Sequence, residues 1–561
     1  MEKGASHQIW RRWVSRRRKL PRFGGWHLFL LVAVAACLAP LALPCVASAA
    51  PPEATRLFPP GAQRNATVTV KVAGSFPVWP AAAWTERPGT LWEPQPESGT
   101  FAVTVAPEAA LGAHLVRFTT PEGATALRRF VVGHLPEIEE TEPNDKPAAA
   151  TAVGEPVVVV NGVLGKGGDV DLYRVALAAG ETIVAQADAN RLLGTAADLT
   201  LDVADARHSL LARNLDATGL DPRVVFTAPV AGEYFVRVYG FPETADATIG
   251  LAGGEAFVYR LTLSKRGFLV ATLPSAVSLG TEAQLAPLGW KLPAEHAPLP
   301  VPAAALAPSA TGAWRSVTVA LDGIGGGVSL PIVEMPVVVV PQAEGESVPP
   351  PVLFSGSLTA AKQRLAHRFT ASKDVTYSLL VEGIAIGTAV DPVLSLEDIE
   401  GKRLAITDDP AGNLSWKAPA DGVYTAVIRD RRGSFGPAHG YRLTIRPDLP
   451  GVKVSCDVDR ASGEPGKPVE LSITIGREHG FKESLDIVLV DPPPGVTAAA
   501  VQSPPEGDAA KKVTLVITAA EPFSGPVRVA ARIAGAADAA PLPVRFGPEG
   551  VETFWLGIKA P

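Results

Sequence analysis

The sequence predicts an all-β fold, a tandem array of β-sandwich domains that follows a signal peptide. Length is the first reason, because 561 residues with 47% apolar content can build three to five separate cores. The second is that 53 glycines and 53 prolines are spread along the chain without a collagen-like period, as in proteins whose many short strands are joined by turns. The third is that apolar and polar residues alternate in short runs, while no long capped segment of helical period follows residue 49.

The first 49 residues have the composition of an export signal. Residues 10–22 (WRRWVSRRRKLPR) are strongly basic, and Leu28–Leu43 form an apolar segment that Pro40 interrupts. Ala47-Ser48-Ala49 then provides the small residues that signal peptidase requires. Because the apolar segment is shorter than the roughly 20 residues of a spanning helix, we expect a cleaved signal peptide and no membrane span after cleavage.

Two further features of this segment leave the export route open. Ser15–Leu20 (SRRRKL) resembles a twin-arginine export motif, although no phenylalanine follows at the usual place. Val34–Cys37 (VAAC) resembles a lipobox, which would make Cys37 a lipidated N-terminus, but the sequence beyond it stays apolar. Each of these routes predicts an exported protein that is periplasmic, on the cell surface or secreted.

The charge of the chain changes sign after the signal segment. Eight Lys/Arg and one Glu in residues 1–49 leave 43 basic and 56 acidic residues in the remainder, a net charge of −13. No basic stripe remains to contact phosphates, so no nucleic acid is expected as a partner. Cys456 is the one cysteine after residue 49, so no intramolecular disulfide is available and each domain must be held by packing.

Residues 55–135 have the pattern of a first sandwich. Val68, Val70 and Val72 alternate with polar residues, which predicts a strand with one buried face. More runs of this kind follow, separated by turn residues such as Pro88-Gly89. A unit of this size with short alternating strands is typical of an immunoglobulin-like domain.

The next unit, residues 139–265, carries the most specific signal. Five segments occur in order: TEPND (141–145), GDVDLYRV (168–175), LTLDV (199–203), APVAGEYFVRVYG (228–240) and VYRLTLS (258–264). Together they resemble the bacterial pre-peptidase C-terminal (PPC) domain. The resemblance implies a jelly-roll β-sandwich of the kind found beside secreted proteases and in multidomain extracellular proteins. In clostridial collagenases, related domains bind collagen.

The remainder of the chain repeats these two units. Ala418–Tyr424 (APADGVY) matches Ala228–Tyr234 (APVAGEY), and Tyr441–Thr444 matches Tyr259–Thr262. The third unit echoes the first in the spacing of Pro, Gly and apolar positions, so we predict a duplicated pair of immunoglobulin-like and PPC-like domains. The expected domains are a signal peptide (1–49), an immunoglobulin-like sandwich (55–135), a PPC-like sandwich (139–265), an immunoglobulin-like domain (267–348), a second, degenerate PPC-like sandwich (350–447) and a C-terminal immunoglobulin-like sandwich (450–547).

Acidic residues at two places in the first PPC-like unit suggest a metal site. Calcium takes about six to eight oxygen ligands. Glu142 and Asp145 flank a turn-prone Pro-Asn pair, while Asp169 and Asp171 are two residues apart and would face the same way on a strand. In the resembled family, calcium is held by the acidic opening segment and by aspartates before the following strand. Those roles map onto Glu140, Glu142, Asn144, Asp145, Asp169 and Asp171, which would otherwise be solvated turn residues.

The repeated unit lacks these acids and offers an internal comparison. Residues 361–369 read AKQRLAHRF, with Lys362, Gln363 and Arg364 near the positions of the two aspartates. We therefore predict that cations replace the ligands and that this unit holds no metal. Since its strands persist without the acids, the fold itself does not require them.

No catalytic pattern accompanies the candidate calcium site. The nine histidines form no zinc set, and no nucleophile elbow, Walker loop or dinucleotide-binding loop occurs, so we do not expect an enzyme. Trp79, Trp84 and Trp92 either fill the core of the first unit or anchor a ligand.

We therefore predict an exported, non-catalytic binding or scaffolding protein of the cell envelope or extracellular space. Its expected partner is an extracellular protein or polysaccharide, and calcium would stiffen the first PPC-like domain. Two alternatives remain open. One is an accessory protein that acts with a secreted peptidase in trans, and the other is a purely structural spacer of the envelope.

Overall fold

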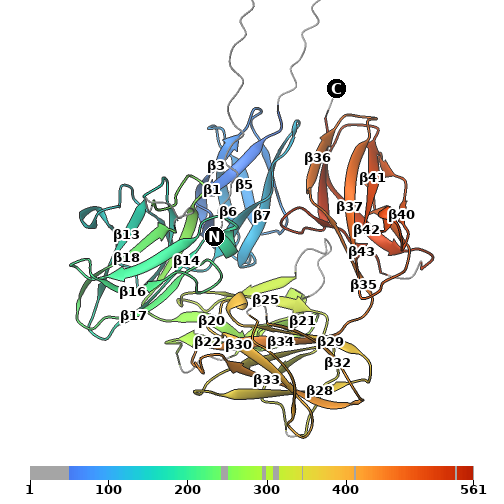
Figure 1. Cartoon of the computed structure of the whole chain (residues 1–561). Helices are drawn as coiled ribbons and strands as arrows, with labels where there is room; N and C mark the ends of the chain where they lie inside the picture. Colours follow the sequence, from blue (N-terminus) through green and yellow to red (C-terminus); the bar gives the residue numbers. More distant parts are fainter. Residues whose placement is uncertain are drawn as a thin grey trace, which may run out of the picture. The chain divides into compact units, whose positions relative to one another are not determined.

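The computed structural model describes residues 50–241, 250–293, 298–306, 315–343, 345–409, 412–536 and 540–559, and it confirms the all-β prediction (Figure 1). Strands make up almost every regular element, and the longest helical segments in these ranges have four residues. The expected signal peptide, with Cys37, lies outside the described residues. No helix in the described ranges is long and apolar enough to cross a membrane.

The first unit is a sandwich whose core is filled by aromatic side chains. Its sheets are β1 (Glu53–Phe58), β3 (Thr67–Ser75), β6 (Thr100–Val105) and β5 (Thr90–Pro94), and β2 (Gly61–Gln63), β9 (Arg128–Gly133), β7 (Gly112–Thr120) and β4 (Ala82–Thr85), with β8 (Gly123–Ala124) beside β7. Trp92 packs edge-to-face on Phe118 and Phe130 at centroid distances of 5.6 and 5.1 Å. Trp79 packs against the same core. These two tryptophans therefore contribute to packing.

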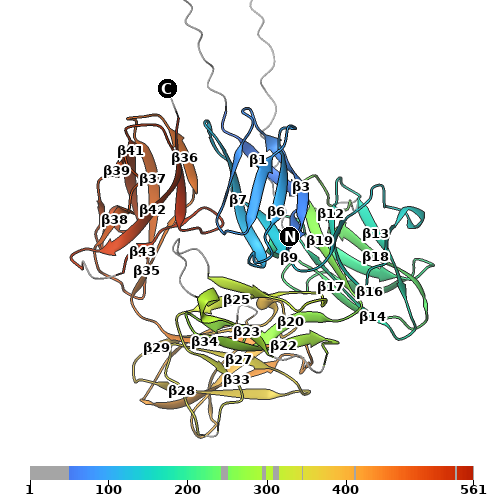
Figure 2. The same cartoon turned by 180° about the vertical axis from the view of Figure 1, so that it is seen from behind.

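The second unit has two five-stranded sheets, which can be followed from both sides in Figures 1 and 2. The first sheet is β10 (Glu137–Glu139), β12 (Val157–Val163), β19 (Val258–Ser264), β14 (Thr182–Asp188) and β17 (Arg223–Thr227); the second is β11 (Thr151–Val153), β13 (Val170–Leu177), β18 (Gly232–Gly240), β15 (Leu199–Ala204) and β16 (Leu210–Asn214). The short helix α1 (Asn190–Leu193) and the 3-10 turn η1 (Pro147–Ala149) lie in its loops. Alternate residues such as Val175 on β13 and Val236 on β18 fill the core between the sheets.

The fourth unit has the same strand order. Its sheets are β26 (Val337–Val339), β27 (Val352–Ser357), β34 (Gly440–Pro447), β29 (Thr376–Glu382) and β32 (Asn413–Lys417), and β28 (Arg364–Ala371), β33 (Gly422–Asp430), β30 (Pro392–Glu397) and β31 (Arg403–Thr407), with the turn η3 (Ile384–Ile386). The first sheet matches β10-β12-β19-β14-β17, and the second matches β13-β18-β15-β16. The repeat that the sequence predicts therefore extends to the order of the strands.

Among its described residues, the third unit has fewer strands than the other four units. It has two three-stranded sheets, β20 (Phe268–Leu273), β22 (Ala283–Trp290) and β23 (Leu299–Val301), and β21 (Val277–Ser278), β25 (Val328–Val333) and β24 (Ser316–Val319), with the turn η2 (Ala303–Leu306). Val277, Leu285, Val301 and Leu330 form its buried core. This small core follows from the short apolar runs in its sequence.

The fifth unit is again a two-sheet sandwich. Its sheets are β39 (Val496–Ala498), β41 (Lys512–Ala519), β37 (Val469–Glu478), β35 (Gly451–Cys456) and β44 (Arg545–Phe546), and β36 (Arg460–Gly463), β45 (Thr553–Ile558), β42 (Phe523–Ile533), β38 (Leu485–Val490) and β40 (Val501–Ser503), with β43 (Leu542–Pro543) beside β42 and the turn η4 (Asp508–Ala510). The strand β45 lies beyond the expected boundary at residue 547 and pairs with β36 and β42. Cys456 is buried in this core, where it acts as a small apolar side chain.

Candidate metal centre

Glu140 is held at the end of the first sheet of the second unit. It follows β10 directly, and its backbone N–H donates to the carbonyl of Asn161 on β12 at 3.0 Å. Its Oε1 accepts a hydrogen bond from the N–H of Val163 at 2.6 Å. Gly162 makes this close approach possible, since a Cβ there would lie 2.8 Å from Glu140 Oε2 and 2.3 Å from the Tyr259 ring. The Glu140 carboxylate is therefore fixed next to the buried Tyr259.

Asp171 reaches the same place from the second sheet. It lies on β13, is fully buried, and accepts a hydrogen bond from the Tyr259 hydroxyl through Oδ2. Tyr173 lies two residues further along β13, and its hydroxyl donates to Glu140 Oε2 at 3.1 Å. The two tyrosine hydroxyl oxygens are 2.5 Å apart. Two carboxylates and two phenols, drawn from both sheets, thus form one hydrogen-bonded cluster inside the sandwich.

Glu142 completes a group of three carboxylates. One oxygen from each of Glu140, Glu142 and Asp171 lies within 4.8 Å of the others. The side chain of Glu142 is exposed, and its Oε2 accepts the N–H of Asn144 at 3.0 Å, which closes a short turn. The group is therefore accessible to an ion from the side of Glu142.

Two buried polar groups near these carboxylates lack a hydrogen-bond partner among the described residues. Asn144 is fully buried, and neither its side-chain oxygen nor its side-chain nitrogen is paired. Oδ1 of Asp171 is likewise buried and unpaired. An unpaired buried group costs about 1–3 kcal/mol, so an ion that these oxygens ligate would offset part of that cost. The carboxylate and amide oxygens present here fit a hard cation.

Asp169 and Asp145 lie beside this group, and Asp169 also shapes the backbone. It precedes β13, and its Oδ2 accepts the N–H of Gly165 at 2.6 Å, which closes the glycine-rich turn. Burial raises the pKa of the Asp169 carboxyl, and side-chain contact with Asp145 raises it further. The structure thus brings the six residues proposed as ligands to one end of the sandwich, with three of them in the tight group.

Two carboxyl groups of this site, those of Glu140 and Asp171, have raised pKa values in the metal-free protein. Burial raises the pKa of Glu140 to about 7, although its hydrogen bonds oppose the shift. Burial also raises the pKa of Asp171 to about 10, and the negative charge of Glu140 adds to this effect. A divalent cation between them would reverse the balance, because an opposite charge within about 4–6 Å favours the ionised form of a carboxyl.

Tyr173 and Tyr259 are residues of this site that the sequence-based reasoning misses. Both are fully buried, and burial raises the pKa of each phenol well above its usual value, so both remain hydrogen-bond donors. Tyr173 is two residues from Asp171 and therefore on the same face of β13. That spacing within GDVDLYRV is the signal that places a tyrosine next to a ligand.

In the fourth unit, Val340 takes the place of Glu140. Gly356 pairs with Tyr441 across β27 and β34, as the glycine and tyrosine described above pair across β12 and β19. A Cβ on Gly356 would lie 2.6 Å from Val340, at the position where the second unit has its glutamate. Val340 belongs to the buried core of the fourth unit. An apolar side chain therefore fills the space that a ligand has in the second unit.

Leu365 and His367 stand where the second unit has its buried aspartate and tyrosine. Their strand, β28, pairs with β33 in the register that β13 has with β18. The ring of His367 is fully buried, with Nδ1 2.8 Å from the Ala426 carbonyl and Nε2 2.9 Å from the Tyr441 hydroxyl. Burial lowers the pKa of His367 to about 4, so the neutral ring donates through Nδ1 and accepts through Nε2. His367 and the Tyr441 hydroxyl therefore have hydrogen-bond partners without an ion.

Gln363 retains the turn before β28 without a charge. Its Oε1 accepts the N–H of Thr359 at 2.6 Å, as Asp169 accepts a glycine N–H in the second unit. The prediction that cations replace the ligands is corrected here, since Arg364 pairs with Glu397 at 2.6 Å and the ligand positions hold neutral side chains. A buried cation would require a counter-charge, whereas apolar side chains pack without one.

Comparison with known proteins gives partial matches. A probable subtilase-type serine protease of Deinococcus radiodurans is 31% identical over 142 residues, which are 25% of this chain and 17% of the protease. Among solved structures, fibronectin(III)-like modules of Clostridium thermocellum CbhA share 11% identity at a TM-score of 0.13, covering 39% of this chain and 92% of that one. Escherichia coli alpha-2-macroglobulin activated by porcine elastase shares 11% identity at a TM-score of 0.14, covering 89% and 52%. The match to the protease thus spans less than a fifth of that relative's length.

The match that bears on the candidate site is a family model. The bacterial pre-peptidase C-terminal domain matches residues 169–240, from Asp169 to the end of β18. Asp171 and Tyr173 fall within this range, whereas Glu140 and Glu142 precede it. The second unit of this chain therefore contains a PPC domain, and its candidate metal centre joins that domain to the segment just before it.

Proposed function

We propose that this protein is an exported, non-catalytic binding or scaffolding protein in which calcium stiffens the PPC domain of the second unit. The fourth unit is, in this proposal, a second PPC-like domain without a metal site. PPC domains are characteristic of secreted bacterial peptidases, which supports export to the cell envelope or extracellular space. The expected partners are extracellular proteins or polysaccharides.

One observation carries the calcium assignment. Glu140, Glu142 and Asp171 converge to within 4.8 Å, and the buried side chain of Asn144 beside them is unpaired. The convergence of like charges is unfavourable unless a cation is bound. Because the group contains oxygen donors and no His or Cys, calcium fits better than zinc or another soft metal.

Glu140, Glu142, Asp171 and Oδ1 of Asn144 would hold the ion, with Asp145 and Asp169 nearby. Bound calcium would supply positive charge and fixed oxygen coordination, which orders the segments that carry its ligands. Within this chain, Tyr173 and Tyr259 orient the buried carboxylates through their hydroxyl groups.

The position of Glu140 connects this ordering to the start of the domain. Residues 134–136 are all that separate β9 of the first unit from β10, and Glu140 directly follows β10. An ion that fixes Glu140 would therefore stiffen the chain where it enters the PPC domain. This is a structural role, and no reaction step is assigned to the metal.

Thermal melting with calcium and with chelator tests this proposal. We expect calcium to raise the melting midpoint. At a calcium concentration 100 times Kd, binding adds about 2.7 kcal/mol to the free energy of unfolding. Asp171→Asn should abolish the response to calcium. Asp205→Asn is the matched control, because Asp205 is a half-buried turn residue of the same unit whose Oδ1 accepts two backbone N–H groups, outside the group of three carboxylates. Equal midpoints in calcium and in chelator for the unmodified protein would contradict the proposal.

A second candidate function is favoured by the comparisons. The PPC match and the partial likeness to a subtilase-type protease point to an accessory protein that acts with a secreted peptidase in trans. Purification from native culture fluid would support this candidate if a peptidase activity stays with the protein through two separations. An envelope spacer, the remaining alternative, predicts no binding at micromolar concentration to arrays of glycans and matrix proteins.

A further inference from the structure

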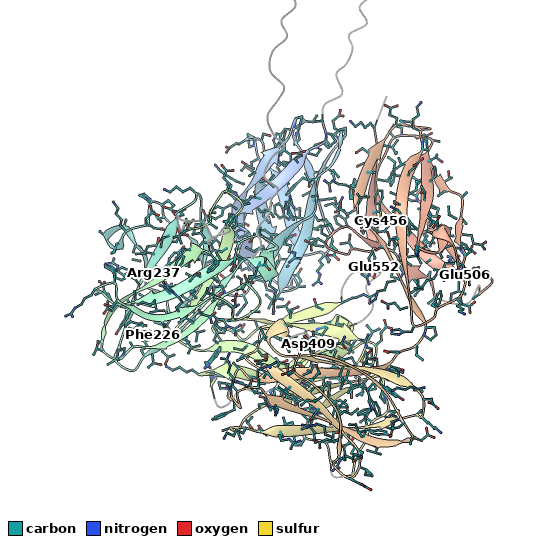
Figure 3. All side chains as sticks on the ribbon, in the orientation of Figure 1. Phe226, Arg237, Asp409, Cys456, Glu506 and Glu552 are labelled. Carbon is teal, nitrogen blue, oxygen red and sulfur yellow. The ribbon has the colours of Figure 1, made fainter. Side chains whose placement is uncertain are left out.

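A network of charged side chains lies on the outer face of the second sheet of the PPC domain, away from the metal centre. Asp202 is fully buried beneath it and accepts two hydrogen bonds from Arg213, from Nε at 2.7 Å and from a terminal nitrogen at 3.0 Å. Arg237, labelled in Figure 3, donates a third hydrogen bond at 2.7 Å. The Tyr239 hydroxyl donates a fourth at 3.2 Å. We call Asp202, Arg213, Arg237 and Tyr239 the arginine face.

Strand pairing brings these side chains together. Asp202 on β15 lies opposite Arg213 on β16 and opposite Arg237 on β18. Its neighbours Leu201 and Val203 point into the core of the sandwich, so Asp202 points outward. The arginine face therefore spans three adjacent strands of one sheet.

This face carries an excess of positive charge. Two guanidinium groups share the single carboxylate of Asp202, which leaves a net charge of +1 on the network. The side chains of Arg213 and Arg237 are 45% and 25% exposed. Each arginine has one terminal nitrogen with no hydrogen-bond partner among the residues that the structure describes, so both can donate to a ligand. Asp202 fixes the plane of the Arg213 guanidinium through two hydrogen bonds and anchors Arg237 through one before any ligand arrives.

The fourth unit shows that the sandwich does not require this network. Ser395 on β30 occupies the position of Asp202, and it lies opposite Ile406 on β31 and Val427 on β33. The pairing of β30 with β31 has an irregularity in register between two consecutive residues, as the pairing of β15 with β16 does. Because the same framework forms with neutral side chains, the charges of the arginine face are available for a role other than folding.

We propose that the arginine face binds the carboxylate groups of an acidic polysaccharide. This rests on the proposed function, which includes polysaccharides among the partners, and it names one class and one site. Arg213 and Arg237 would each donate a charge-assisted hydrogen bond through the free terminal nitrogen to a carboxylate of the sugar chain.

The shape of the face favours a polysaccharide over an added polypeptide strand. The arginine face is an open sheet surface, and it contributes no residue to the two main cavities of the described chain. β16 is the edge strand of the sheet, but its pairing with β15 is irregular, and such irregularities at an edge disfavour the addition of another strand. The ligand would therefore be bound by side chains and not by backbone pairing, and the carboxylates of a sugar chain can accept hydrogen bonds from these side chains. Because the contact is between opposite charges at an exposed surface, it should weaken as salt increases.

Binding of oligogalacturonate, with neutral dextran as the reference, tests the proposal in the full chain. We expect binding that weakens as salt increases, and no comparable binding of dextran. The triple substitution Asp202→Ser, Arg213→Ile and Arg237→Val reproduces the fourth unit, so the sandwich should still fold, and it should weaken oligogalacturonate binding at least about tenfold, as expected for lost charged hydrogen bonds. An unchanged melting midpoint of this variant in calcium verifies the fold.

The reverse substitution provides a gain of function. Ser395→Asp, Ile406→Arg and Val427→Arg should create a second arginine face and increase the number of oligogalacturonate molecules bound per chain. The proposal is overturned if the unmodified protein binds oligogalacturonate no better than dextran, if the triple variant binds as well as the unmodified protein, or if poly-glutamate binds more tightly than the sugar. Asp171→Asn separates the two proposals, since loss of its calcium response should leave oligogalacturonate binding in place.

Discussion

Asp171 is the residue that best distinguishes a metal ligand from an ordinary buried acid. A buried carboxyl group that is not arranged for a metal ion has its oxygens satisfied by hydrogen-bond donors, as Asp202 does with two arginines and a tyrosine. Asp171 has a partner for Oδ2 alone, and Oδ1 is buried without one. A second carboxylate, that of Glu140, lies nearby instead of a cation. The unpaired oxygen of Asp171 and the neighbouring carboxylate of Glu140 destabilise the metal-free protein. A cation bound between them would stabilise it.

The pKa shifts predict how stability depends on pH. The pKa values of Glu140 and Asp171 rise from 4.5 and 3.8 to about 7 and about 10 in the folded, metal-free protein. At a pH between the unfolded and folded pKa of a group, that group binds more protons in the folded state than in the unfolded state. The free energy of unfolding therefore falls as pH rises, by up to about 1.4 kcal/mol per pH unit for each group. Urea denaturation in chelator should therefore show lower stability at pH 8 than at pH 5.5, and calcium should reduce the difference.

Asp171→Asn provides the check on this prediction. The variant cannot ionise at position 171, so its stability in chelator should decline less between pH 5.5 and pH 8 than that of the unmodified protein. Asp205→Asn should retain the full decline, because Asp205 lies outside the group of three carboxylates. An identical decline in all three proteins would mean that other carboxyl groups control the pH dependence.

At the scale of single residues, the sequence predicts the candidate ligands but not their surroundings. Acidic residues in TEPND and GDVDLYRV, together with the family resemblance, indicate the six candidate ligands. The partnership of Tyr173 with Tyr259 depends on the two sheets being packed face to face, which no local pattern contains. The turn-closing role of Asp169 becomes recognisable once Gln363 is seen to do the same without charge.

At the scale of elements, alternation is a reliable guide to long strands and a poor one to short strands. The strands at Gly232–Gly240 and Val258–Ser264 follow from their patterns. The strand β10, Glu137–Glu139, does not, because two of its three residues are acidic and it is held by parallel pairing with the distant β12. The sequence pattern also fails to predict the final strand, β45. Its two neighbours, β36 and β42, are far away in sequence.

Side chains of the fourth unit can be grafted onto the strands that form the candidate metal centre. Replacing Glu140→Val, Asp171→Leu and Tyr173→His gives β10 and β13 the side chains found around β26 and β28. We expect this variant to melt at a higher temperature in chelator than the unmodified protein, because Val and Leu replace two adjacent buried carboxyl groups, one of which has an unpaired oxygen. Its midpoint should not respond to calcium. Differential scanning calorimetry in calcium and in chelator measures both effects, and a destabilised graft that still responds to calcium would contradict them.

At the scale of the whole molecule, two units have the same strand order, and one of them contains the acidic group. The framework therefore forms with the acidic group and without it. The order of units along the chain follows from repeated segments such as APVAGEY and APADGVY. The smaller number of strands among the described residues of the third unit could not be predicted, because its sequence repeats the spacing of Pro, Gly and apolar positions of the first unit.

The most direct test of the account is the number of calcium ions bound per chain, measured by isothermal titration calorimetry on the full protein after removal of metal. We predict one ion per chain for the unmodified protein and for Asp205→Asn, and none for Asp171→Asn or for the graft from the fourth unit. The absence of calcium binding by the unmodified protein at millimolar concentration, or binding that Asp171→Asn leaves unchanged, would contradict the account.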